Sequence, residues 1–176
     1  MQFDYSTCDL IVALQRKYGA KVFGKIAQYL MAITLHELGW KNIRNHISED
    51  ADLDAMTATN AKYTFEMKTS ASHYAHIGVK DIKSIKEREV DGYRGFFLVL
   101  RVGKQAEWFA VPYSGENIQV GNIGFVRFRL ACDPLLSDSL NSKFPTVLED
   151  HYECIDKQGL PGLRKTMDSM GIEVVE

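Results

Sequence analysis

The segment ADLDAMTATNAKYTFEMKTS, residues 51–70, constrains the fold of this chain more than any other segment does. Residues 51–58 and 62–69 are short runs in which apolar and polar side chains alternate, which is the pattern of half-buried strands. The polar sequence TATNAK between the two runs predicts a turn. The segment therefore predicts a β-hairpin with one face in the core.

Charged side chains gather on one face of this predicted hairpin. Residues two apart on a strand share a face, so Glu66 and Lys68 point to one side while Met67, between them, points into the core. Asp52 and Asp54 likewise share a face of the preceding strand. If the turn closes the hairpin, one or both aspartates lie opposite Glu66 and Lys68.

The rest of the chain predicts helices around further strands. Apolar spacing and end signals predict helices at about 6–17, 21–38 and 78–89. Further strands are predicted at 41–47, 95–102 and 106–112. Beyond Ser114 the pattern predicts a strand at 123–131, a short helix in LPGLRKTMDSMG and an edge strand in IEVVE. This order predicts an α/β fold, with a mixed central β-sheet flanked by helices.

The composition limits the classes to which the chain can belong. With 21 basic and 23 acidic residues among 176, the net charge is −2. Proteins held on nucleic acid by bulk charge are usually basic, so this charge does not favour that class. A local basic cleft is still compatible with it. The three cysteines show no CxxC spacing, so neither a disulfide framework nor a zinc site is predicted. No apolar run reaches membrane-spanning length, and the N-terminus lacks the basic region of a secretory signal. We expect a cytoplasmic protein with no membrane segment.

The acids of the hairpin suit one kind of chemistry. Two carboxylates about one metal's width apart form a hard oxygen site for Mg²⁺, which retains waters and binds substrate phosphate. A neighbouring lysine stabilises the charge that develops on a phosphodiester, or helps to prepare a water. The alternative is an exposed hairpin with a Glu–Lys ion pair across its strands, since a Glu-x-Lys triplet is common by chance. The helix before the hairpin and the helix and apolar strand after it favour the catalytic interpretation.

The hairpin resembles the signature of the PD-(D/E)XK nuclease superfamily, which includes type II restriction endonucleases and archaeal-type Holliday-junction resolvases. The matching residues are Asp54 and, after eleven intervening residues, Glu66, Met67 and Lys68. The resemblance covers about residues 20–113 and implies a restriction-endonuclease-like core. It also implies that Asp54 and Glu66 bind Mg²⁺, with Mn²⁺ as a substitute, and that the Met67 carbonyl is a third ligand. Lys68 would be the catalytic lysine.

Two positions depart from that signature. The proline usual before the aspartate is absent, so Asp52 competes with Asp54 for the ligand role, and Asp54 is favoured because small or apolar residues follow it. In the first helix Gly24 and Gly39 match the frame of the family, yet Gln28 stands where the family often has a glutamate. A glutamine can hold a metal-bound water without adding charge. Gln28 is therefore a candidate catalytic residue, and the site is expected to bind one metal ion more readily than two.

Polar residues that follow the hairpin are candidates for contact with DNA. They are Ser70, Ser72, His73, His76, Lys80 and Lys83. Each has a structural alternative. The serines and histidines are also typical of a polar turn, and the lysines of a solvated helix face that pairs with acids such as Asp81 and Glu87.

We expect one nuclease domain over residues 1–176, with a core at about 20–113 and recognition or dimerisation elements at 114–176. The favoured function is a Mg²⁺-dependent endonuclease of the type II restriction class, which cuts double-stranded DNA at a specific sequence as a homodimer. One alternative is a Holliday-junction resolvase, although such enzymes are typically basic and this chain is not. Another is a non-catalytic DNA-binding member that keeps the fold alone.

Overall fold

A computed structural model describes residues 5–48, 51–103 and 106–176 of the chain. The helices are α1 (Tyr5–Glu37), α2 (Val79–Val90), α3 (Phe125–Ala131) and α4 (Pro134–Ser169). The strands are β1 (Lys41–His46), β2 (Leu53–Met56), β3 (Lys62–Ser70), β4 (Tyr74–Ile77), β5 (Arg94–Arg101), β6 (Glu107–Pro112), β7 (Gly121–Gly124) and β8 (Glu173–Val175). Within these described ranges, no helix combines the length and the apolar character needed to span a membrane.

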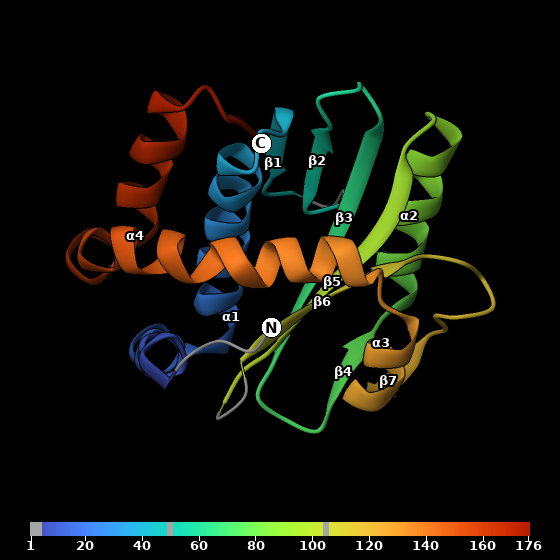
Figure 1. Cartoon of the computed structure of the whole chain (residues 1–176), viewed down its shortest axis with the longest axis horizontal. Coiled ribbons are helices and arrows are strands. Elements are labelled where there is room, and N and C mark those ends of the chain that lie inside the picture. Colours follow the sequence, from blue (N-terminus) through green and yellow to red (C-terminus); the bar gives the residue numbers. More distant parts are fainter. Residues whose placement is uncertain (1–4, 49–50, 104–105) are drawn as a thin grey trace.

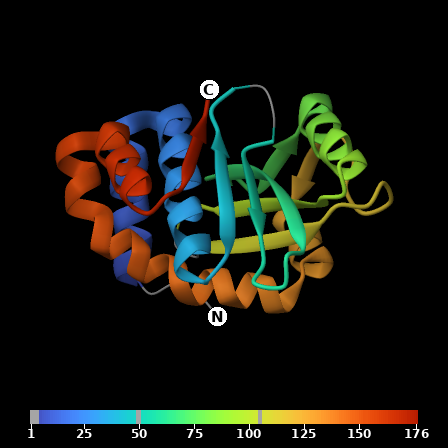
Figure 2. The ribbon, with the colours of Figure 1, turned by 90° about the horizontal axis from the view of Figure 1, so that it is seen from above.

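Six strands form one mixed sheet, in the order β6-β5-β3-β2-β1-β8. β5 runs parallel to β3 and β8 runs parallel to β1, whereas the other neighbouring pairs are antiparallel. β4 and β7 pair separately as a small antiparallel sheet. Helices α1 and α4 lie on one side of the main sheet and α2 lies on the other, with α4 running across the strands (Figure 1, Figure 2). The predicted mixed sheet flanked by helices is confirmed.

Each face of the main sheet packs into its own hydrophobic cluster. On the side of α1 and α4 the strands contribute buried residues such as Phe65 and Leu98. On the side of α2 and α3 they contribute Phe97 and Val99. Because β5 is covered on both faces, its sequence is the continuous apolar run FFLVL rather than an alternating one.

The predicted hairpin is present as β2 and β3. The two strands are antiparallel, with Leu53 opposite Phe65 and Asp54 opposite Thr64. Leu53, Phe65 and Met67 are buried in the cluster that α1 covers. Side chains alternate along a strand, so the acid and the lysine on either side of Met67 point toward α2. The predicted division of this hairpin into a core face and a charged face is therefore correct.

Of two predictions near the helices, one is confirmed and one needs correction. The helices predicted at 6–17 and 21–38 are present as the two parts of α1, because Gly19 leaves helical geometry between them, with a φ of 76°. The single strand predicted at 123–131 is wrong, because β7 ends at Gly124 and α3 follows. Phe125 and Phe128 are the buried residues of α3, and their spacing of three places both on one face of a helix, whereas in a strand they would point to opposite faces.

The segments after β3 and α3 also differ from expectation. The loop expected around residues 73–76 is mostly strand β4, whose partner β7 is remote in sequence and so gave no local signal. The short helix predicted in LPGLRKTMDSMG is confirmed as the part of α4 after the break in helical geometry at Gly159, whereas the longer part before Gly159 was not predicted. The edge strand predicted in IEVVE is confirmed as β8.

Candidate active site

A cavity of about 360 Å³ lies beside the part of β3 that extends past its partner β2. In the hairpin register, β2 begins at Leu53 opposite Phe65, whereas β3 continues to Ser70. The residues of β3 beyond Phe65 therefore have no partner in β2. This exposed edge forms one wall of the cavity, with Lys68 on it, and α1 forms the other.

Asp52 lies at this cavity, and its carboxylate accepts the hydrogen bond that a partner strand would otherwise accept from β3. Its Oδ2 accepts a hydrogen bond of 2.7 Å from the backbone N–H of Met67. Its own carbonyl oxygen accepts from the Gln28 side chain at 2.8 Å and from the backbone N–H of His46 at 2.9 Å. The N–H and C=O of one strand residue point to the same edge. The carbonyl of Met67, which also lines the cavity, therefore points toward Asp52.

Lys68 is held between two carboxylates on the face toward α2. Its Nζ lies 3.2 Å from Oε1 of Glu66 and 2.8 Å from Oδ2 of Asp81. Asp81 is in the first turn of α2, and the same oxygen accepts a 2.7 Å hydrogen bond from the backbone N–H of Gly78. The beginning of α2 thus fixes the position of the ammonium group.

The acids of this group have perturbed pKa values. Burial and the charges of Asp52 and Asp81 raise the pKa of Glu66 to about 9, although Lys68 acts in the opposite direction. Burial also raises the pKa of Asp52, against the effects of the Met67 N–H and of two lysines, Lys25 and Lys68. At neutral pH Glu66 therefore retains a proton when no cation is bound.

Lys68 and Asp81 have pKa values that favour their charged forms. Burial acts to lower the pKa of Lys68, but Glu66 and Asp81 outweigh it and the pKa rises. Burial acts to raise the pKa of Asp81, but the hydrogen bonds from Lys68 and Gly78 outweigh it and the pKa falls. The two residues form a charged pair next to a neutralised acid.

This crowding of acids fits a divalent cation. A cation near Asp52 and Glu66 would relieve their repulsion and release the proton from Glu66. Within the described ranges, no group of three His, Cys, Asp or Glu side chains is arranged to hold a metal ion. The donors present are two carboxylates and the Met67 carbonyl. Such a set suits Mg²⁺, which binds through one or two carboxylates and keeps waters for substrate phosphate.

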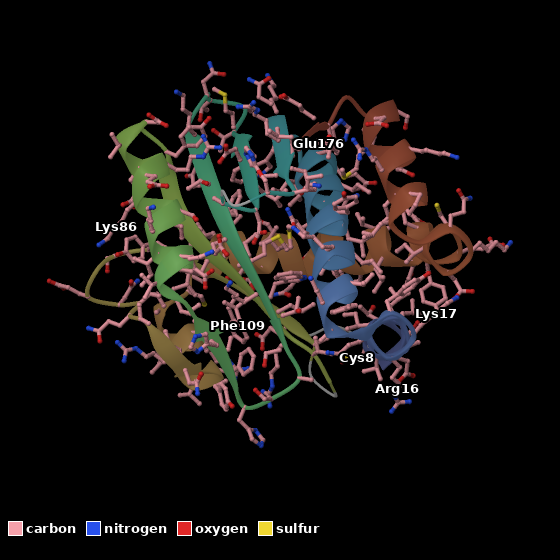
Figure 3. All side chains as sticks on the ribbon, turned by 180° about the vertical axis from the view of Figure 1, so that it is seen from behind. Cys8, Arg16, Lys17, Lys86, Phe109 and Glu176 are labelled. Atoms are coloured by element: carbon pink, nitrogen blue, oxygen red, sulfur yellow. The ribbon has the colours of Figure 1, made fainter. Side chains whose placement is uncertain are left out.

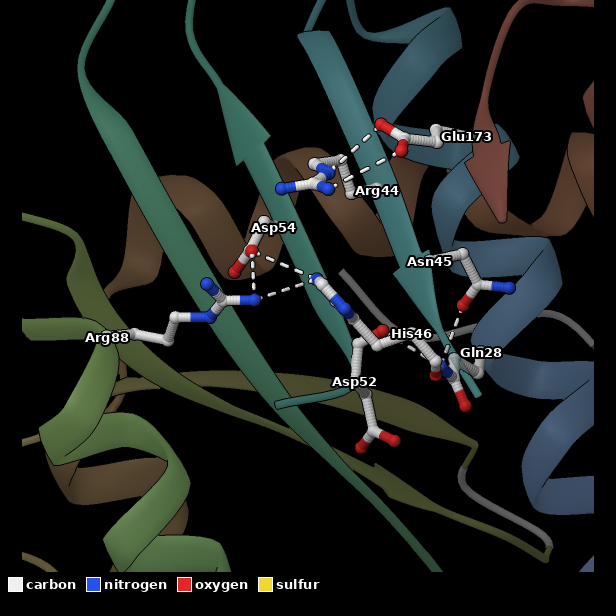
Figure 4. Close-up of polar contacts among 8 residues, drawn as sticks. All are labelled: Gln28, Arg44, Asn45, His46, Asp52, Asp54, Arg88 and Glu173. Atoms are coloured by element: carbon white, nitrogen blue, oxygen red, sulfur yellow. Dashed lines mark hydrogen bonds and ion pairs between the residues drawn. The ribbon is translucent and has the colours of Figure 1, made fainter. Parts of the chain in front are cut away.

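Asp54 belongs to a different group of residues. Its Oδ2 lies 2.9 Å from the Arg88 guanidinium and 3.0 Å from Nε2 of His46, while the Asp52 carboxylate points away from both (Figure 4). Asp54 and His46 are 1% and 2% exposed. In the register Asp54 is opposite Thr64, two residues before Glu66. Asp52 is the aspartate whose charge acts on Glu66, so this geometry favours Asp52, while the ligand role of Asp54 stays a prediction.

Gln28 is buried, and both the nitrogen and the oxygen of its side-chain amide form hydrogen bonds. Nε2 lies 2.7 Å from Oδ1 of Asn45 and 2.8 Å from each of the carbonyl oxygens of His46 and Asp52. Oε1 accepts a hydrogen bond from Lys25 at 3.2 Å. Two amide hydrogens serve three acceptors, so Nε2 has no free hydrogen, whereas Oε1 keeps a second lone pair that can accept from a metal-bound water. The catalytic role of Gln28 stays a prediction. This arrangement supports a role for Gln28 in fixing the backbone at Asp52.

The residues predicted to contact DNA do not line the cavity. The hydroxyls of Ser70 and Ser72 both donate to the Tyr74 carbonyl and close the turn before β4. His76 is exposed and bonds through Nδ1 to Asn122 of β7. His73 is exposed in the same turn. Contact of these four residues with DNA stays a prediction.

The lysines predicted to contact DNA lie on the exposed face of α2. Lys80 is exposed, and Lys83 pairs with Glu87 at 3.6 Å. Lys86, on the same helix, projects outward from the molecule (Figure 3). The spacing predicted one basic face for these lysines, and contact of that face with DNA stays a prediction.

Three residues of the site were not singled out from the sequence: Lys21, Lys25 and Asp81. Asp81 was interpreted as an ion-pair partner of lysines on its own helix, although its place three residues after Gly78 is typical of an acid that caps a helix. Lys21 and Lys25 stand seven and three residues before Gln28. That spacing places all three on one helical face, and this signal could have identified them.

Comparisons with known proteins give one solved structure of interest. No family model and no curated protein match the chain. The chain is similar to the structure of Archaeoglobus fulgidus Hjc, a Holliday junction resolvase from an archaeal hyperthermophile, with 12% sequence identity and a TM-score of 0.47. The match covers 58% of this chain and 89% of that one. At this level of similarity no residue roles transfer, and the function proposed below rests on the site itself.

Proposed function

We propose that this protein is a divalent-metal-dependent endonuclease of the PD-(D/E)XK type, which hydrolyses phosphodiester bonds in DNA. One observation carries the proposal. Asp52 and Lys68 line one cavity, Glu66 lies 3.2 Å from Lys68, and burial together with the charges of Asp52 and Asp81 raises the pKa of Glu66 to about 9. Such crowding costs stability in the absence of a cation, and perturbed acids of this kind cluster at functional sites.

In this proposal Asp52 and Glu66 hold the metal ion, with the Met67 carbonyl as a third ligand. The ion, when bound, supplies Lewis-acid stabilisation of a phosphodiester oxygen and lowers the pKa of water. The choice of Asp52 is supported by its 2.7 Å contact with the N–H of Met67. It is supported further by the ion pair that commits Asp54 to Arg88.

Lys68 stabilises the negative charge that develops on the phosphate. Asp81 and Glu66 raise the pKa of its ammonium group, so it donates hydrogen bonds and does not accept a proton. Asp81 is a positioning residue, because it fixes Nζ of Lys68 at 2.8 Å and is itself fixed by the N–H of Gly78. The site needs no covalent intermediate.

Sequence-specific cleavage of duplex DNA by a homodimer is the finer proposal. The net charge of −2 supports it, because recognition through base edges depends less on bulk charge than binding to the DNA backbone does. Each subunit of a two-fold dimer would cut one strand of a symmetric site. Mg²⁺ is the proposed cofactor, with Mn²⁺ as a substitute.

A cleavage assay tests the proposal. The purified chain is incubated in Mg²⁺ with long duplex DNA and, separately, with a synthetic four-way junction; EDTA and a Lys68→Ala variant serve as controls. Discrete duplex fragments that require metal and Lys68 would support the restriction-type function. Cleavage of the junction alone would support the nuclease activity but would assign the substrate of a resolvase instead of a specific duplex sequence. Absence of cleavage in both Mg²⁺ and Mn²⁺ would refute the nuclease proposal.

A further inference from the structure

The cavity beside Asp52 carries basic residues on both of its walls. α1 contributes Lys21 and Lys25, and the edge of β3 contributes Lys68. The two walls come together at Gly24, where a Cβ atom would lie 3.9 Å from Oγ1 of Thr69. The walls therefore form a short groove lined by lysines from both sides, which suits a chain of phosphates.

The position of Lys25 in this groove is fixed by Gln28. Nζ of Lys25 donates to Oε1 of Gln28 at 3.2 Å, and Nε2 of Gln28 is held by three acceptors at 2.7–2.8 Å. An amide oxygen orients an ammonium group without neutralising it, whereas a carboxylate at the same place would form an ion pair. The contact therefore restricts the position of Lys25 without pairing it with a carboxylate.

The charges on the two walls also limit how many metal ions the site can hold. Asp52 and Glu66 together supply the charge that one divalent cation requires. A second cation near α1 would need further carboxylate ligands, but this wall presents Lys21, Lys25 and the engaged amide of Gln28. The α1 wall thus repels a second metal ion and attracts an anion.

We propose that Lys25 binds the reacting DNA phosphodiester from the α1 wall, across the groove from Lys68, and supplies the positive charge that a second metal ion would otherwise supply. Gln28 is the positioning residue that holds Lys25 in this orientation. The inference rests on the proposed nuclease function and adds a substrate-binding residue to the same site.

DNA binding without metal tests the contact directly. Affinity for a short labelled duplex is measured by fluorescence anisotropy in EDTA over a range of salt concentrations. Lys25→Gln should lower the slope of log affinity against log salt by about 1, because each duplex phosphate contact contributes about 0.9. Lys25→Arg should keep the wild-type slope. Lys157→Gln, which removes a charge from the exposed face of α4, should also keep it.

Cleavage in saturating Mg²⁺ and DNA tests whether the bound phosphate is the reacting one. Lys25→Gln should lower kcat by about 10²-fold, as expected for loss of a group that stabilises transition-state charge. Lys25→Arg should recover part of that loss. An unchanged kcat with a lower salt slope would overturn the proposal, since Lys25 would then contact a flanking phosphate.

Gln28→Glu separates positioning from simple structural support. The new carboxylate would pair with Lys25, so the folded variant should show the lower salt slope of Lys25→Gln, with its folding checked by circular dichroism. A change in melting temperature with the wild-type slope would assign Gln28 a structural role only.

Two results of these experiments have separate meanings. A wild-type slope in Lys25→Gln refutes the inference, whatever the activity of the protein. Failure of the wild-type chain to cut DNA refutes the proposed function, and with it the role of Lys25 at a reacting bond; the slopes in EDTA would then report only whether Lys25 contacts DNA.

Discussion

Asp52 and Asp54 are two residues apart, one just before β2 and the other within it, yet their surroundings differ in every respect that matters to chemistry. Asp54 is 1% exposed, and its charge is matched by the Arg88 guanidinium at 2.9 Å. Asp52 lines a cavity, accepts a hydrogen bond from a backbone N–H, and shares its surroundings with another acid, Glu66. One aspartate is neutralised within the protein, and the other retains the capacity to bind a cation.

This difference arises from helix packing. α2 crosses the sheet so that Arg88, near its end, covers Asp54, while Asp81, near its beginning, holds Lys68. A buried ion pair contributes little net stability, but removal of one partner leaves a costly uncompensated charge. The group around Asp54 should therefore affect folding, and the group around Asp52 should affect catalysis.

The largest effect is expected for Asp52→Asn. Loss of a metal-binding carboxylate should reduce cleavage by about 10³-fold or more, because the ion accounts for several kcal/mol of transition-state stabilisation. Single-turnover cleavage in Mg²⁺ measures the loss, and circular dichroism checks that the fold is intact. Asp54→Asn, assayed well below its melting temperature, should retain most of the activity. The opposite ranking would return the ligand role to Asp54, as the sequence alone favoured.

A large effect on stability is expected for Asp54→Ala. The variant removes the buried carboxylate that pairs with Arg88 and should lower the free energy of unfolding by about 3 kcal/mol, as measured by urea denaturation. Arg88→Met should lower it by a similar amount, because it removes the guanidinium that pairs with the buried Asp54 carboxylate. The double variant should lose much less than the sum of the two, because the residues form one ion pair. Additive losses would contradict the coupling.

A pH-dependent gain in stability is expected for Glu66→Gln. The pKa of Glu66 is raised to about 9 in the folded protein, so its protonated form contributes stability that is complete below its ordinary pKa and is lost as the pH rises toward 9. Glutamine cannot ionise, so without metal the variant should exceed the wild type by on the order of 4 to 5 kcal/mol at pH 8, and by about 1 kcal/mol at pH 5.

The effect of Mg²⁺ completes that experiment. The ion should stabilise the wild type and should have little effect on Glu66→Gln, which lacks a ligand. Thermal melts at both pH values, with and without Mg²⁺, measure all of these differences. A gain for the variant that does not change with pH would show that Glu66 ionises normally in the folded protein.

The smallest effect is expected for Lys83→Gln on α2. The lysine is exposed and paired with Glu87 at 3.6 Å, so its loss should change stability by at most about 0.5 kcal/mol. DNA affinity should fall by about twofold, well below the effect of Lys25→Gln. Anisotropy at one salt concentration compares the two variants. A larger loss for Lys83→Gln would show that the exposed face of α2, and not the α1 wall, is the main phosphate contact.

The local pattern of the sequence was enough to predict the hairpin and the side to which each residue points. Alternation along β3 placed Phe65 and Met67 in the core and Glu66 and Lys68 on the opposite face, because successive strand residues must point to opposite sides. The prediction of a strand at 123–131 was wrong because the pattern there is less distinctive. Its short apolar pattern fits more than one period, and the packing of Phe125 and Phe128 selected a helix.

The sequence by itself thus determined which residue types lie along one face of the hairpin, since that depends only on backbone geometry. The tertiary structure decided which of them share a site. Arg88 is 34 positions from Asp54, and Lys25 is 27 positions from Asp52, so neither neighbour follows from local spacing. Charge compensation depends on distances of a few ångströms between helices and strands. Packing alone therefore paired Asp54 with Arg88 and left Asp52 at the cavity.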